Sequence, residues 1–270
     1  MQYTVKNGIN ASQLKIIALV CMTLDHIAAF GLSGRYFHTP MRIIGRIAAP
    51  LFLFLLVQGI KHTRNKSKYI LRLYIAGALI QIFNTLLDPN QIAGYGNILP
   101  TFMYTVLFIV AIERITSSIK GRKWRHMVIP ILTILVTVIL SIIYLHINRN
   151  GIGGILLRIF APSIFRLEYS FLFVLLGIAW YFIKNPIYNC AIFAILSAIC
   201  GLVDVNVMLR FTAILPFNFF QLFIGTQWCM ILAIPFMLLY NGNKGKGGKW
   251  FFYVYYPLHQ YVIYALASLV

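Results

Sequence analysis

The sequence contains very few acidic residues and few charges of either sign. Only 5 of its 270 residues are Asp or Glu, against 23 Lys and Arg, and charged residues make up 10% of the chain. Soluble domains usually contain about a quarter charged residues, so this composition excludes an ordinary soluble enzyme. The scarcity of carboxylates also argues against a paired-carboxylate active site and against a magnesium cage.

Cysteine is scarce as well, and the sequence motifs of several enzyme classes are missing. The four cysteines lie in apolar segments without CxxC or histidine spacing, so we predict free thiols and no metal site. No HExxH, GxSxG, P-loop or GxGxxG motif occurs. These absences exclude zinc proteases, serine hydrolases and the common nucleotide-binding enzymes.

Long apolar runs dominate the chain. Hydrophobic residues make up 60% of it, and a membrane span needs about 20 mostly apolar residues in a helix. Nucleic-acid-binding proteins can be equally basic, but they lack such runs, so no nucleic acid is expected as a partner. The runs do not alternate as barrel strands do. The candidate spans are residues 14–32, 43–60, 69–87, 98–115, 127–145, 169–183, 187–203, 219–240 and 250–270.

We therefore predict an all-α fold, a polytopic transmembrane helical bundle with about nine spans (eight to ten). One membrane domain would account for residues 1–270. Two regions leave the count open. Residues 148–168 contain three glycines and Pro162 and suit either a surface amphipathic helix or a re-entrant loop. Residues 211–240 contain Pro216 and Pro235, so a half-helix could precede the span.

The distribution of Lys and Arg predicts the orientation. Most of the 23 basic residues fall in segments that are cytoplasmic if the N-terminus is cytoplasmic, and positively charged loops stay inside. We expect a multi-pass protein of the cell (inner or cytoplasmic) membrane.

The first span carries two charged residues, Lys15 and Asp25, and a histidine, His26. Ionisable groups at membrane depth are costly and usually functional. Lys15 and His26 lie on one helix face, about 16 Å apart along the axis, with Lys15 at the inner rim. Asp25 points about 100° away from His26 and needs a partner on another helix. The structural alternative is an Asp that pairs with an Arg and a His bonded to a carbonyl.

Two arginines at the start of the second span, Arg42 and Arg46, are one helical turn apart. Arg46 can reach the depth of Asp25, so a buried Asp25–Arg46 pair is predicted. The inner end of this span continues into a basic segment with His62, Arg64 and Lys68. It suits either a loop attracted to anionic lipid or a phosphate-binding rim.

The last span supplies Lys249, Tyr253, Tyr256 and His259. The last three recur every third residue and share a stripe of the helix. His259 lies about 13 Å deeper than Lys249, near the depth of His26. We therefore predict that His26 and His259 meet in one cavity. An interfacial aromatic belt is the alternative for the two tyrosines.

Three separated blocks contain most of the polar residues described above, and they cover roughly the first 75 and the last 25 residues. The first is Ser12-Gln13-Leu14-Lys15-Ile16-Ile17-Ala18-Leu19 with Met22 and Asp25-His26-Ile27. The second is Arg42-Ile43-Ile44-Gly45-Arg46-Ile47-Ala48 with Pro50-Leu51-Phe52 and His62-Thr63-Arg64. The third is Gly247-Gly248-Lys249-Trp250-Phe251-Phe252-Tyr253 with Tyr256-Pro257-Leu258-His259. In this order the three blocks resemble the TraX family of membrane-bound pilin N-acetyltransferases.

The resemblance implies an acetyltransferase that takes cytoplasmic acetyl-CoA as acyl donor and a peptide, pilin amine or glycan hydroxyl as acceptor. His26 would be the general base, with Asp25 and His259 completing the catalytic set. Arg42, Arg46, Tyr253 and Tyr256 would orient the site. The CoA phosphates would be held by Lys15, His62, Arg64, Lys68 and Lys249. The family often has Glu where this chain has Gln58, for which a supporting role is expected.

Two other functions fit the same residues. A proton-coupled transporter or lipid flippase would use Asp25 and His26 as a proton relay, although inverted repeats are not evident in the sequence. A non-enzymatic assembly factor for pili or cell-wall polymer would keep these polar residues for structure alone.

Overall fold

The computed structural model describes residues 8–88, 96–211, 225–246 and 249–269, with the side chains of residues 202–211, 249–250 and 252–253 outside the description. Within these ranges the regular structure is helical, and no β-strand is formed. A single isolated bridge in the same ranges pairs Ile9 with Tyr240. The predicted all-α class is confirmed.

The chain divides into two compact units, Met1–Leu55 with Ile183–Val270, and Leu56–Phe182. Helix α3 (Ala48–Lys61) begins in the first unit and ends in the second. The other helices of the first unit are α1 (Ala11–Ala29), α2 (Gly34–Gly45), α9 (Pro186–Phe211), α10 (Ile234–Leu238) and α11 (Lys249–Ala267). Those of the second unit are α4 (Lys66–Leu87), α5 (Leu99–Lys120), α6 (Val128–His146), α7 (Ile152–Phe160) and α8 (Ser170–Phe182).

Several helical segments are long and apolar enough to cross a membrane. The described residues contain five, namely Ala11–Ala29, Gly34–Lys61, Lys66–Leu87, Leu99–Lys120 and Trp124–His146. Shorter apolar helices are Ser170–Phe182, Pro186–Gly201 and Gln227–Leu238. The protein is therefore a helical membrane protein, whereas nine spans, a cytoplasmic N-terminus and a single domain stay predictions.

The second predicted span is broken where the sequence suggested one continuous helix. Helix α2 ends at Gly45 and α3 begins at Ala48. Pro50 has no N–H, so it cannot bond the carbonyl of Arg46, and its ring clashes with a continuous helix at this point. The break places Arg46 at a helix end.

The two regions that the sequence left open are both helical in part. Residues 148–168 contain α7 and a 3-10 helix, Ile164–Arg166. Residues 211–240 contain a 3-10 helix, Gln227–Ala233, which continues into α10. Pro235 lies in the first turn of α10, a position that suits proline because its fixed φ matches the start of an α-helix. Residues 212–224, including Pro216, lie outside the described residues.

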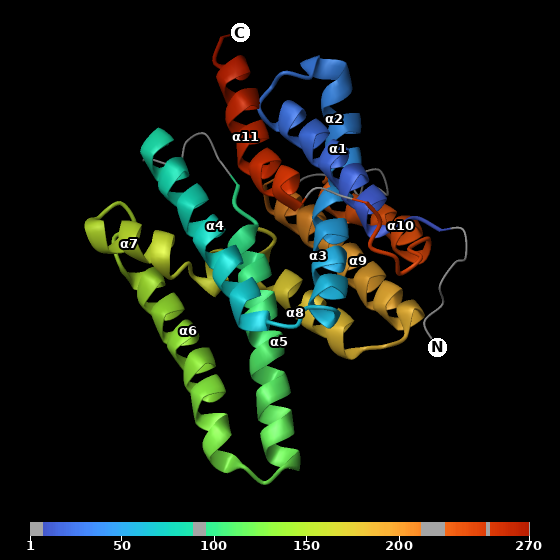
Figure 1. Cartoon of the computed structure of the whole chain (residues 1–270). Coiled ribbons are helices and arrows are strands. Elements are labelled where there is room, and N and C mark those ends of the chain that lie inside the picture. The colour runs from blue at the N-terminus through green and yellow to red at the C-terminus, as the bar shows by residue number, and fades with distance from the viewer. Residues whose placement is uncertain (1–7, 89–95, 212–224, 247–248, 270) are drawn as a thin grey trace. The chain divides into compact units, whose positions relative to one another are not determined.

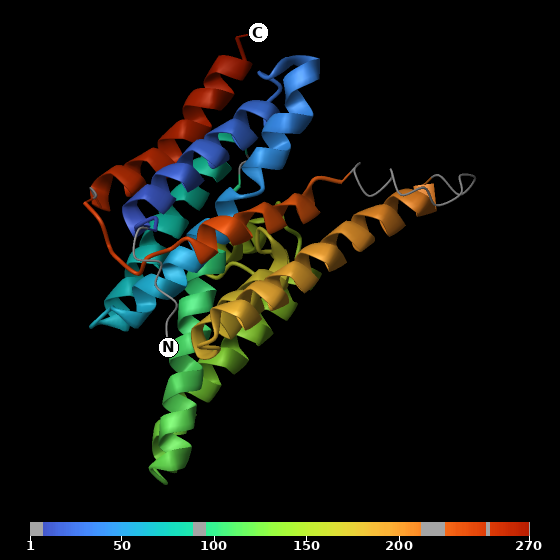
Figure 2. The ribbon, with the colours of Figure 1, turned by 90° about the vertical axis from the view of Figure 1, so that its right-hand side faces the viewer.

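In the first unit, α1 packs between α2 and α11 (Figures 1 and 2). Asn10 and Gln13 form a capping box at the start of α1, which satisfies the exposed N–H groups of its first turn. The same end is tied to the segment before α11, because the backbone N–H and the hydroxyl of Ser12 both donate to the carbonyl oxygen of Lys244. These bonds fix the register between α1 and the approach to α11.

In the second unit, α5 is the central helix and contacts α4, α6 and α8 (Figure 1). Its buried residues include Thr101, Phe102, Val106 and Ile109. By contrast, α6 exposes large apolar side chains along its length, among them Ile129, Leu132, Val136, Ile139 and Ile143. Lipid solvates such a surface at no cost, as expected for a helix at the edge of a membrane protein.

Candidate functional site

Two histidines from opposite ends of the chain meet in the first unit. Nδ1 of His26, on α1, lies 2.7 Å from Nε2 of His259, on α11. The ring centroids are 4.8 Å apart and the ring planes are within 17° of each other. The rings therefore meet edge to edge, nearly coplanar, which is the geometry of a direct ring-to-ring hydrogen bond. The predicted contact between His26 and His259 is confirmed, whereas the cavity predicted around them stays a prediction.

The direction of this hydrogen bond follows from the next contact. Nδ1 of His259 lies 2.9 Å from the backbone carbonyl oxygen of Tyr255. A carbonyl oxygen only accepts, so Nδ1 of His259 carries the proton. In neutral rings Nε2 of His259 is then the acceptor, and Nδ1 of His26 donates to it. This order leaves the lone pair of His26 on Nε2.

The lone pair of His26 faces a buried amide. Nε2 of Gln260 lies 3.5 Å from Nε2 of His26, and Gln260 is 2% exposed. At this distance the amide is at most a weak donor. Nε2 of His26 is thus positioned by the ring bond on its other side and is available as a base.

Tyr255, on α11, contacts His259 on its own helix and also bonds to α1, so it links the two helices that carry the histidines. Its ring lies parallel to that of His259, with centroids 5.3 Å apart, and its hydroxyl lies 2.7 Å from Oγ1 of Thr23. The Thr23 hydroxyl donates to the carbonyl oxygen of Leu19, so Tyr255 donates to Thr23. The sequence prediction missed Tyr255, although a residue four positions before His259 shares its helix face.

Of the two tyrosines that the sequence suggested, the structure describes the side chain of Tyr256 alone. The ring of Tyr256 lies 6.1 Å from that of His259, at 50°. The side chain of Tyr253 lies outside the described residues. Tyr256 therefore lies beside His259 on α11, and the orienting role of Tyr253 and Tyr256 stays a prediction.

Asp25 forms a buried ion-pair cluster with both arginines. Its Oδ1 lies 2.7 Å from Nη2 of Arg46 and 2.9 Å from Nη1 of Arg42. Arg46 also donates to Oε1 of Gln227 at 2.9 Å, from the 3-10 helix that precedes α10. The predicted Asp25–Arg46 pair is confirmed, and Arg42 joins it. Gln227 was not predicted, because its segment showed no polar periodicity.

Gly45 makes the close approach of α1 and α2 possible. A Cβ atom at this position would overlap the side chain of Asp25. The cluster holds two guanidinium groups against one carboxylate, so an excess positive charge stays beside the histidine-bearing helix. Arg42 is the more accessible cation, since its side chain is 26% exposed and that of Arg46 is 9% exposed. Within the described part of the chain, Asp25 has no hydrogen bond to either imidazole.

The predicted phosphate-binding residues fall into both units. Lys15 is half-buried on α1, and the side chain of Lys249 lies outside the described residues. His62, Arg64 and Lys68 are exposed around the start of α4, in the second unit. A shared rim formed by these residues stays a prediction. None of the four cysteines, all of which are described, is in a disulfide bond, as predicted. No group of three or more His, Cys, Asp or Glu that could hold a metal occurs where the structure is described.

Comparison with known proteins gives the family. No solved structure matches the chain. It is 39% identical over 77 residues, or 27% of each chain, to the uncharacterized protein RP591 of Rickettsia prowazekii (strain Madrid E). It is 29% identical over 258 residues to the "Probable fimbrial assembly protein FimC, serogroup H1" of Dichelobacter nodosus, covering 93% of this chain and 92% of that protein. The family described as TraX protein matches residues 10–199, which is most of the chain, and the protein therefore belongs to the TraX family.

Proposed function

We propose that this protein is a membrane-bound acetyltransferase that transfers the acetyl group of acetyl-CoA to an amine or a hydroxyl. The observation that carries the proposal is the hydrogen-bond order from His26 through His259 to the carbonyl of Tyr255. It leaves Nε2 of His26 as a proton acceptor. The other nitrogen of that ring, Nδ1, is held by its hydrogen bond to His259. Base, orienting group and fixed tautomer are the elements of nucleophile activation in acyl transfer.

In the proposed reaction, Nε2 of His26 takes a proton from the acceptor nitrogen or oxygen. That atom attacks the thioester carbonyl carbon, a C–N or C–O bond forms, and the C–S bond breaks. The CoA thiolate then takes the proton from His26, so the products are the acetylated acceptor and free CoA. When His26 is protonated, its Nδ1–H bond to His259 becomes charge-assisted and stronger. His259 is therefore a positioning residue, and general base catalysis at His26 contributes about 10²–10⁴-fold.

In this proposal Asp25 takes no part in the transfer of the proton to His26. It contributes by pairing with the two arginines. Its carboxylate neutralises one of two guanidinium groups. The remaining positive charge of Arg42, the more exposed of the pair, suits the oxygen that becomes negative as the thioester carbonyl is attacked. Lys15, Lys249, His62, Arg64 and Lys68 are proposed to bind the phosphates of acetyl-CoA from the cytoplasm.

The similarity to a protein named for fimbrial assembly favours a pilin or other peptide amine as acceptor. A sugar hydroxyl is the second acceptor class, because the same base activates either group. The proposed location is the inner or cytoplasmic membrane, where acetyl-CoA is available on one face.

Isotope-labelled acetyl-CoA tests the proposal. Membranes containing the protein are supplied with it, and peptide, glycan and lipid fractions are analysed by mass spectrometry. We expect label in one fraction with the wild type and none with His26→Ala. The matched control is His38→Ala, which removes an exposed histidine on α2 and should leave transfer unchanged. Uptake or movement of a solute or lipid without consumption of acetyl-CoA would instead support the transporter or flippase. Normal pilus assembly by His26→Ala would support the assembly factor.

A further inference from the structure

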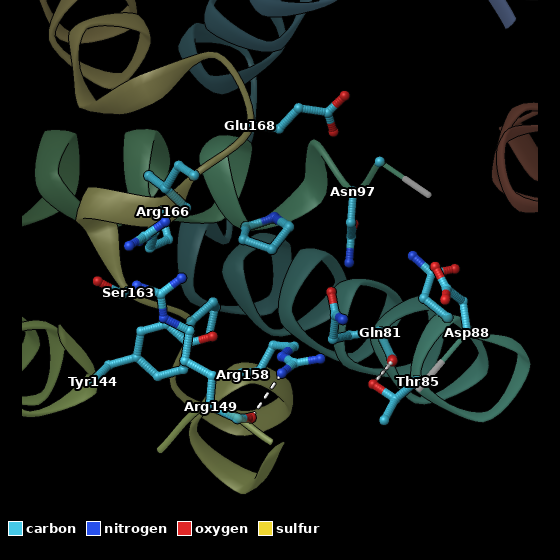
Figure 3. Close-up of a pocket in the computed structure, with 15 residues that line it drawn as sticks. Gln81, Thr85, Asp88, Asn97, Tyr144, Arg149, Arg158, Ser163, Arg166 and Glu168 are labelled. Atoms are coloured by element: carbon cyan, nitrogen blue, oxygen red, sulfur yellow. Dashed lines mark hydrogen bonds between the residues drawn. The ribbon is translucent and has the colours of Figure 1, made fainter. Parts of the chain in front are cut away.

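The second unit contains a polar cavity that none of the candidate site residues described above lines. It has a volume of about 420 Å³, within the range of small-molecule sites. Its walls come from α4, α6, α7 and the segment between α7 and α8. The lining is unusual for a membrane protein because it contains three arginines, Arg149, Arg158 and Arg166, together with amide and hydroxyl side chains (Figure 3). Two carboxylates, those of Asp88 and Glu168, also line it, so the arginines exceed the acidic residues by one.

Two of the arginines form no direct ion pair with the described residues. Arg149 and Arg166 have exposed side chains, and neither guanidinium has an ion-pair or hydrogen-bond partner among the residues that the structure describes. Figure 3 shows the two groups on the same side of the cavity, with Asp88 on the opposite side. Guanidinium groups that line one cavity repel each other, and a carboxylate or phosphate bound in that cavity relieves this repulsion and accepts hydrogen bonds from them.

The third arginine is part of the wall. Arg158 is 8% exposed, and its Nη2 donates to the carbonyl oxygen of Arg149 at 2.8 Å. This bond ties α7 to the segment that carries Arg149. It therefore fixes the backbone from which the Arg149 side chain enters the cavity.

The rest of the lining offers groups that hydrogen-bond to hydroxyls. Tyr144 is 6% exposed, yet its hydroxyl has no hydrogen-bond partner in the described ranges. The side-chain amide of Gln81 has none there either. A buried phenol and an amide with unused donors and acceptors suit a ligand with several hydroxyl groups. In contrast, the side-chain amide of Asn97 already has a hydrogen-bond partner, because its Nδ2 donates to the carbonyl oxygen of Gly77.

We propose that this cavity binds a small polyhydroxylated anion, a sugar acid or a sugar phosphate, with its anionic group between Arg149 and Arg166 and its hydroxyls toward Tyr144 and Gln81. A sugar acid and a sugar phosphate have the same two recognisable parts, an anionic group with several oxygens and a ring with several hydroxyl groups. The inference is independent of acetyl transfer, because its evidence lies within the second unit and its test measures binding.

The test is calorimetric titration of the full-length protein in octaethylene glycol monododecyl ether, a detergent without sugar or phosphate groups. The probes are glucose 6-phosphate, glucuronate, glucose and inorganic phosphate. We expect the two charged sugars to bind, and glucose to bind at least about tenfold more weakly. The tighter of the two charged sugars identifies the preferred anionic group. Failure of both charged sugars to bind at millimolar concentration would overturn the proposal.

Variants separate the two ends of the cavity. Arg149→Gln with Arg166→Gln should weaken both charged sugars at least about tenfold. Gln81→Leu should weaken the sugar anions and leave inorganic phosphate unchanged. The control is Arg125→Gln, an exposed arginine outside this cavity. If the double variant does not fold, competition on the wild type decides, because inorganic phosphate must displace glucose 6-phosphate. Binding that the arginine variants leave unchanged, or the absence of this competition, would contradict the assignment.

Discussion

Nδ1 of His26 donates a 2.7 Å hydrogen bond to Nε2 of His259, a residue 233 positions further along the chain. Because His259 in turn donates to the carbonyl of Tyr255, the two rings have unequal roles. The first should carry the proton that is transferred, and the second should hold the first in place. This asymmetry can be measured.

His26→Ala and His259→Ala should differ in their effect on acetyl transfer. Loss of the base should lower the rate by about 10²–10⁴-fold, whereas loss of the orienting ring should cost less. The double variant should be no slower than His26→Ala alone, since a positioning residue has no effect without the group it positions. Initial rates with labelled acetyl-CoA give all three values. Equal and additive losses would mean that each imidazole acts independently.

Tyr255→Phe should destabilise the protein by about 1 kcal/mol, because it removes the hydroxyl that bonds Thr23. The ring that lies parallel to His259 is kept, so the fold should persist. Thr23→Val removes the other partner, and SDS-induced unfolding measures both. The double variant serves as the control. If it costs as much as the sum of the single variants, the two hydroxyls are not energetically coupled.

Asp25→Asn should be strongly destabilising, by about 3 kcal/mol or more, because it leaves two buried or half-buried guanidinium groups without a counter-charge. The matched comparison is Glu113→Gln in the second unit. Glu113 pairs with Lys66 at 2.6 Å, but their side chains are 33% and 25% exposed. Because this pair is better solvated, Glu113→Gln should lower the free energy of unfolding by only about 1 kcal/mol or less. Similar losses for both variants would show that burial does not set the strength of the Asp25 cluster.

Gly45→Ala should destabilise the packing of α1 on α2, although alanine is the better helix former by about 1 kcal/mol. A Cβ at this position overlaps Asp25, so α1 and α2 would have to separate. Gly59→Ala is the control, since a Cβ at that position meets nothing within 4 Å. Thermal unfolding of the two variants in the same detergent should shift in opposite directions. A stable Gly45→Ala would contradict the close approach.

The sequence alone determined the class of the fold and the two ends of the candidate site. Uncharged apolar runs of membrane length require helices, because lipid offers no partner for an exposed peptide group. The depth of His26 and His259 followed from helical rise, which depends only on residue number. A carboxylate at membrane depth needs a cation beside it in any helical arrangement. Arg46 was the cation that Asp25 could reach.

The tertiary structure decided which atoms touch. Tyr255, which the three-residue spacing did not single out, contacts both His259 and Thr23, because the rotation of α11 about its axis depends on packing against α1. Gln227 bonds Arg46 from residues 211–240, a segment that contains two prolines and shows no helical periodicity of polar residues. The arginines of residues 148–168 gather around a cavity only once α4, α6 and α7 are packed. Sequence spacing fixes height along a helix, whereas contacts between helices depend on rotation and proximity, which long-range packing alone sets.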